Sequence, residues 1–130
     1  MRTSEAEAPL KTLTIVLTDG PYISEYADMA CKLAGAALNH YHVNIFLYLD
    51  AVHIPKNGQA PSFFSSLGEL FTDLAEKGAV IRACARCAAA RGYQAKAGDS
   101  EDYPPGIKVT SLYELAGMLS ESDRIIALSR

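Results

Sequence analysis

Two cysteines three residues apart, Cys84 and Cys87, are the side chains of this sequence best suited to chemistry. They follow a short apolar run, residues 79–83, that is typical of a buried strand, and they lead into an alanine-rich segment that ends at Gly92. A cysteine at the point where a strand gives way to a helix lies near unpaired backbone N–H groups and the positive end of the helix dipole. Both favour the thiolate, which is the reactive form of cysteine. We therefore expect Cys84 to be a nucleophilic or sulfur-carrying thiol.

The surroundings of Cys84 leave two interpretations open. Arg82, Arg86 and Arg91 place positive charge near the thiol in sequence, which favours the thiolate, although Arg86 and Arg91 equally suit a solvated helix surface. Cys87 has the spacing of a dithiol partner, because residues i and i+3 share one face of a helix. It is either a resolving thiol that forms a disulfide with Cys84 or a packing residue.

Other chemistries have weaker support. The cysteine pair supplies only two of the four ligands of a structural zinc site, and His40, His42 and His53 have no cysteine beside them in sequence. The small number of ligands argues against a metal site. The absence of a glycine-rich phosphate-binding motif argues against a nucleotide cofactor, so neither a metal nor a cofactor is expected. Asp19 and Asp50 are candidates for acid–base groups, but such residues more often form turn hydrogen bonds.

Composition limits the class of protein. Three cysteines without an export signal argue against a disulfide scaffold, and Cys31 lies in an apolar helical stripe where cysteine behaves as a small hydrophobe. A net charge of −3 without a basic patch argues against direct nucleic-acid binding. No apolar run approaches the roughly 18 residues that span a bilayer. We expect a cytoplasmic protein with a flexible leader over residues 1–10 and one domain over residues 11–130.

Apolar patterning predicts the elements that position these residues. Short apolar runs predict five strands, and the segments between them have helical periodicity. The strands are expected at 13–17, 42–49, 79–83, 107–109 and 123–128, and the helices at 24–39, 62 or 65–77, 84–91 and 112–120. Ser24 is a predicted helix cap, and either Thr110 or Ser111 caps the last helix, with Glu114 at a capping-box position relative to Ser111. Residues 92–106 form a long loop.

Alternation of strand and helix predicts an α/β fold, a three-layer α/β/α domain with a mostly parallel sheet of about five strands. The carboxyl ends of parallel strands meet at one edge of a sheet, where ligands and chemistry gather. Asp19, Asp50 and Cys84 each follow a predicted strand, so we expect all three at that edge.

Four segments of the chain carry a resemblance to a known family: residues 19–22, 48–52, 84–92 and 111–128. In their order and spacing they resemble the DsrE/TusD branch of the DsrE/DsrF-like sulfur-transfer proteins. The resemblance implies a three-layer α/β/α domain that assembles into trimers or hexamers, alone or with sister subunits. It also implies a persulfide-carrying cysteine eight residues before the glycine of an Arg-Gly pair, which is Cys84 here.

Two departures from the family pattern affect this site. Ala51 stands where the family often has glycine, and Cys87 is an additional thiol. The resemblance favours a cytoplasmic sulfur relay in which Cys84 receives sulfane sulfur from a donor protein and passes it to an acceptor protein. The alternatives are a dithiol redox or regulatory protein that uses Cys84 and Cys87, and an inert structural subunit of a sulfur-relay complex.

Overall fold

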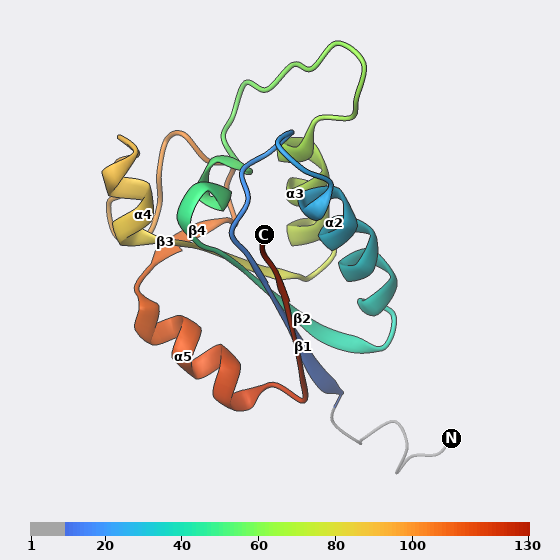
Figure 1. Cartoon of the computed structure of the whole chain (residues 1–130). Helices are drawn as coiled ribbons and strands as arrows, with labels where there is room; N and C mark the ends of the chain where they lie inside the picture. Colours follow the sequence, from blue (N-terminus) through green and yellow to red (C-terminus); the bar gives the residue numbers. More distant parts are fainter. Residues whose placement is uncertain (1–9) are drawn as a thin grey trace.

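The computed structural model describes residues 10–130, which are built around a five-stranded sheet in which every strand pairing is parallel (Figure 1). The strands lie in the order β4-β3-β2-β1-β5, so β5 returns to the opposite side of β1. Their bounds are β1 Lys11–Leu17, β2 Tyr41–Leu47, β3 Val80–Cys84, β4 Lys108–Thr110 and β5 Arg124–Leu128. The predicted α/β class and parallel sheet are confirmed.

Helices cover both faces of the sheet, as the three-layer prediction requires (Figure 1). Their bounds are α2 Tyr26–Ala37, α3 Leu67–Glu76, α4 Ala85–Ala90 and α5 Leu112–Glu121, with a 3₁₀ helix, η1, over Leu49–His53. Alternate residues of β1 face opposite layers. Leu13, Ile15 and Leu17 are buried in the core that α2 and α3 cover, whereas Thr14 hydrogen bonds to Ser122 at the end of α5.

The second apolar run ends as a strand earlier than its composition indicates. The predicted strand extends to Leu49, but β2 ends at Leu47 and η1 begins two residues later. Leu49 has a φ of +54°, in the left-handed region, which turns the chain out of the sheet. A leucine carries no sequence signal for this conformation, and the prediction was wrong here.

Two predicted helix starts also differ from the structure. Ser24 lies one residue before the N-cap of α2, which is Glu25. The Ser24 hydroxyl donates to Asp19 Oδ2 at 2.6 Å and accepts the backbone N–H of Tyr26, the first residue of α2, at 3.3 Å. Phe63 was expected in the next helix but precedes α3 and is 93% exposed. The helix begins after Ser66, whose hydroxyl accepts the backbone N–H of Glu69 and so satisfies one free donor of the first turn.

The long loop between α4 and β4 is present as predicted and contains only an isolated bridge between Lys96 and Asp99. A hydrogen bond from Asn57 N–H to the Asp102 carbonyl joins it to the loop after η1. The predicted leader lies outside the described residues except for Leu10. Within residues 10–130, no helix is long and apolar enough to cross a membrane.

Candidate functional site

Cys84 lies where the sequence placed it, at the last position of β3 and the N-cap of α4. Its backbone is extended, with φ −66° and ψ 124°, and its side chain is 1% exposed. The side chain accepts no capping hydrogen bond from α4, so the predicted contact between the Cys84 sulfur and the helix amides is not formed. The helix itself has only six residues.

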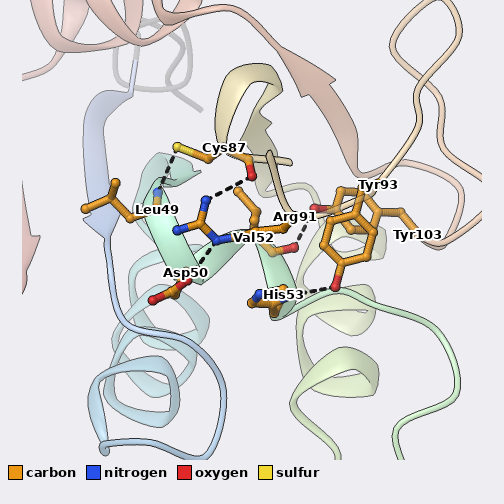
Figure 2. A network of polar contacts seen from close by, with 8 residues as sticks. All are labelled: Leu49, Asp50, Val52, His53, Cys87, Arg91, Tyr93 and Tyr103. Atoms are coloured by element: carbon orange, nitrogen blue, oxygen red, sulfur yellow. Dashed lines mark hydrogen bonds and ion pairs between the residues drawn. The ribbon is translucent and has the colours of Figure 1, made fainter. Parts of the chain in front are cut away.

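Cys87 is the cysteine whose sulfur receives a backbone hydrogen bond. The N–H of Leu49 donates to Cys87 Sγ at 3.2 Å, which joins η1 to α4 (Figure 2). Burial raises the pKa of the Cys87 thiol, the Leu49 N–H partly opposes that rise, and the neighbouring Cys84 thiol adds to it. The two cysteines are therefore close in space as well as in sequence, and both are free thiols.

The backbone around η1 is tightly constrained. Leu49 is one of few non-glycine residues with a positive φ, a conformation that costs an L-residue about 1–2 kcal/mol. A close approach lies beside it, because a Cβ added to Gly20 would stand 3.3 Å from the Asp50 carbonyl oxygen. Such constrained backbone persists where the surrounding structure holds it in place.

An ion pair secures the next residue of η1. Arg91 Nε donates to Asp50 Oδ1 at 2.7 Å, and the same guanidinium donates to the Cys87 carbonyl at 3.0 Å (Figure 2). The hydrogen bond and charge of Arg91 lower the pKa of Asp50. Asp50 and Arg91 thus connect η1 to the end of α4, which favours a structural role for this carboxylate over an acid–base role.

Two tyrosines after α4 complete this set of contacts. The Tyr93 hydroxyl lies 2.6 Å from His53 Nδ1, and the Tyr103 hydroxyl donates to the Val52 carbonyl (Figure 2). Burial raises the pKa of both tyrosines, most strongly for Tyr103. We call the contacts from Asp50, Val52 and His53 to Arg91 and these tyrosines the η1 clamp. Sequence analysis missed it, because a loop tyrosine carries no pairing signal.

The remaining predicted residues lie nearby or form separate contacts. Asp19 follows β1 at the same carboxyl edge as Asp50 and Cys84, as predicted, but its carboxylate is bound by Ser24 and by Arg130 at 3.0 Å. Cys31 is half-buried against the core, consistent with packing. Among residues 10–130, no group of three or more His, Cys, Asp or Glu side chains is arranged to hold a metal ion.

A surface groove of about 590 Å³ reaches Cys84 from the side of α5. Arg86, Leu112, Tyr113 and Ala116 are among the residues that line it with Cys84. We call it the α5 groove. Its lining is mostly apolar. Leu112 and Tyr113 are 43% and 89% exposed at the start of α5. This adjacent pair of large side chains is the feature of the sequence that could have revealed the groove.

The charges around the α5 groove are largely paired. Arg82 Nε donates to Glu114 Oε2 at 3.0 Å, and Thr110 Oγ1 donates to the other oxygen of the same carboxylate. Ser111 is the N-cap of α5 as predicted, but the predicted capping box is not formed, because the Ser111 side chain makes no capping bond and the Glu114 carboxylate binds Arg82 and Thr110. Arg82 is thereby occupied on the α5 side of the sheet.

Known proteins are similar to this chain in sequence and in architecture. The sequence profile of the DsrE/DsrF-like family matches residues 11–128. The uncharacterized protein MK0008 of Methanopyrus kandleri is 33% identical over 118 residues, which cover 90% of this chain and 93% of that protein. The uncharacterized protein MJ0989 of Methanocaldococcus jannaschii is 34% identical over 114 residues, covering 87% and 96%. The crystal structure of the ychN protein from E. coli has a TM-score of 0.77 at 22% identity, covers 92% of this chain and all of its own, and supports the fold.

Proposed function

This chain belongs to the DsrE/DsrF-like family, and from that premise we propose that it relays sulfane sulfur as a persulfide on Cys84 and delivers it to a partner protein thiol. The observation that carries the proposal is the position of Cys84. The thiol ends a central strand, lies at a helix start and lines a groove that opens to solvent. The residue is 1% exposed, so a partner reaches this thiol only through the groove.

The proposed chemistry consists of two displacements at divalent sulfur. The Cys84 thiolate attacks the outer sulfur of a donor persulfide, which forms the Cys84 persulfide and releases the donor thiolate. An acceptor thiolate then attacks the outer sulfur of the Cys84 persulfide, and Cys84 leaves as a thiolate. Loading extends the buried side chain by one S–S bond, about 2 Å, and so moves the transferable sulfur farther along the groove that Cys84 lines.

A second function is supported by the adjacency of the two thiols. Attack of the Cys87 thiolate on the inner sulfur of a Cys84 persulfide would form a Cys84–Cys87 disulfide and release hydrosulfide. The influence of the Cys84 thiol on the pKa of Cys87 reflects this adjacency. In this dithiol function the protein releases sulfide or responds to the redox state, and Cys87 is the resolving thiol.

The family resemblance also suggests an oligomer, a trimer or hexamer with itself or with sister subunits, that acts in the cytoplasm. Exposed apolar side chains on the edge strand and in the loop before α3, Ile125 and Phe63 among them, favour association. Light scattering of the purified protein measures the assembly, and a monomer at all concentrations would contradict a homo-oligomer.

Mass spectrometry of the intact protein after incubation with polysulfide tests the persulfide directly. We expect the mass of one added sulfur atom, located on Cys84 by peptide mapping. Cys84→Ser should abolish the adduct, whereas the matched control Cys31→Ser should retain it. Full labelling of Cys84→Ser would refute the proposal, and an unlabelled wild-type protein would indicate an inert subunit.

Cys87→Ser separates the two functions. If Cys87 resolves the persulfide, this variant accumulates the Cys84 adduct, and the wild-type protein converts it into an internal disulfide with release of sulfide. Equal adduct lifetimes in the two proteins would exclude a resolving role for Cys87 and leave the sulfur-relay function.

A further inference from the structure

The α5 groove has the chemical character of a peptide-binding surface rather than of a site for a small anion. Tyr113 is 89% exposed and Leu112 is 43% exposed, an unusual exposure for apolar side chains at the start of a helix. Amphipathic aromatic side chains of this kind are enriched at protein interfaces, where they supply rigid contact area. Cys84 lies in the same groove, so whatever covers Tyr113 also covers the thiol.

The unpaired charge of the α5 groove is positive. Arg82 is neutralised by Glu114 and Arg91 by Asp50, whereas within residues 10–130 no carboxylate lies in ion-pair distance of Arg86. Among residues 10–130, no Asp or Glu lines the groove. The whole chain has a net charge of −3, so the charge of Arg86 in this groove is opposite in sign to the net charge of the chain.

A second apolar hollow provides a contrast within the same chain. It has a volume of about 520 Å³, and its lining includes Phe63 and Phe64, together with the acidic Glu25 and Asp28. It contains no cysteine, and its charged residues are all negative. An acidic apolar segment would therefore be favoured by the α5 groove and disfavoured by this hollow.

We propose that the α5 groove docks an acidic, apolar segment of the protein that exchanges sulfur with Cys84. An apolar side chain of that segment packs on Leu112 and Tyr113, a carboxylate pairs with Arg86, and the segment's cysteine meets Cys84. This inference rests on the proposed function and adds to it the chemical class of the partner. Tyr113 and Arg86 are positioning residues for the partner, and neither takes part in the displacement at sulfur.

Two synthetic peptides test the proposal. Each contains one cysteine as a mixed disulfide with thionitrobenzoate and the same leucine and phenylalanine neighbours, flanked by glutamates in one peptide and by lysines in the other. Attack by the Cys84 thiolate forms a protein–peptide disulfide and releases coloured thionitrobenzoate. Rates are measured on the Cys31→Ser/Cys87→Ser protein and divided by the rate with a small neutral aromatic disulfide, which corrects for thiol reactivity.

The acidic peptide should react about two to five times faster than the basic one, the range expected of one partly exposed ion pair. Arg86→Glu should abolish or reverse this preference. Tyr113→Ala should slow both peptides about tenfold relative to the small disulfide, as for an interface anchor. The control Phe63→Ala, in the acidic hollow, should change none of these rates.

The results that overturn the inference are distinct from those that overturn the proposed function. Equal peptide rates, or a preference that survives Arg86→Glu, would refute docking of an acidic segment. Faster reaction of both peptides with the Phe63→Ala variant would instead identify a second copy of this chain, with its aromatic hollow, as the competing occupant of the α5 groove. A protein that prefers the acidic peptide but acquires no sulfur from polysulfide retains the docking site and loses the sulfur-relay function.

Discussion

The two ends of α4 differ in how firmly they are held. At its C-terminal end and in the loop that follows, Arg91, Tyr93 and Tyr103 form the hydrogen bonds of the η1 clamp to Asp50, His53 and Val52 (Figure 2). At its N-terminal end, the Cys84 side chain forms no capping bond and lines a groove. The polar side-chain contacts lie at one end of the helix, and the candidate reactive thiol, held by the pairing of β3 with β4, lies at the other.

This difference indicates how a short helix can position a thiol without binding it. A six-residue helix is too short to be stable alone, so its place must be set by tertiary contacts. The η1 clamp provides those contacts at a distance from Cys84, and the buried sulfur forms no capping bond with α4. The contact of Cys87 with Leu49 N–H lies between the two ends and links them.

Tyr103→Phe tests the comparison of the two ends of α4 at the more buried tyrosine of the η1 clamp. Tyr103 is 3% exposed, and removing its hydroxyl leaves the buried Val52 carbonyl without this donor. An unsatisfied buried group costs about 1–3 kcal/mol, and we expect a loss of unfolding free energy of that size in urea denaturation. Tyr113→Phe is the matched control at the exposed end and should change stability by less than about 0.5 kcal/mol. Equal effects of the two variants would contradict the division between the ends.

Leu49→Gly tests the residue whose backbone N–H binds Cys87 and so links the two ends of α4. Glycine adopts a positive φ without steric cost, so the substitution removes strain of about 1–2 kcal/mol and loses part of that gain to the greater freedom of the unfolded chain. The expected change in unfolding free energy is a gain of at most about 1 kcal/mol. Ala36→Gly, at an exposed position within α2, should instead lose about 0.5–1 kcal/mol. A loss of unfolding free energy in Leu49→Gly as large as that in Ala36→Gly would contradict this expectation. It would show that the Leu49 side chain stabilises the protein more than its positive φ strains it.

The sequence predicts the framework of the site better than its contacts. Alternating apolar runs are sufficient to place the five strands and Cys84 at the end of β3, because burial requires apolar side chains at regular spacing. The left-handed Leu49 was not predictable, because the surrounding structure imposes this backbone conformation on a residue that does not prefer it. The partners of Tyr93 and Tyr103 lie 40 and 51 residues away in sequence, and only the fold brings them together.

The smallest expected effect concerns the outer part of the η1 clamp, the pair of Asp50 and Arg91. The hydrogen bond from Arg91 lowers the folded-state pKa of Asp50 below its ordinary value of 3.8. A lowered folded pKa contributes stability above the unfolded pKa, and this contribution is lost as the pH falls through the folded value. Asp50→Asn should therefore be less stable than the wild type near pH 6, and the two proteins should converge in acid.

Solvent screens this pair, because Asp50 is well exposed, so the difference should also shrink as salt is added. Arg91→Gln loses more than the ion pair, since its guanidinium also binds the Cys87 carbonyl. A double-mutant cycle of both substitutions in urea, at pH 6 and pH 3, isolates the coupling between the two charges. Coupling at pH 6 that disappears in acid supports an electrostatic part of the η1 clamp. Absence of coupling at both pH values would restrict the η1 clamp to its buried tyrosines, which would then hold η1 together with the hydrogen bond from Leu49 N–H to Cys87.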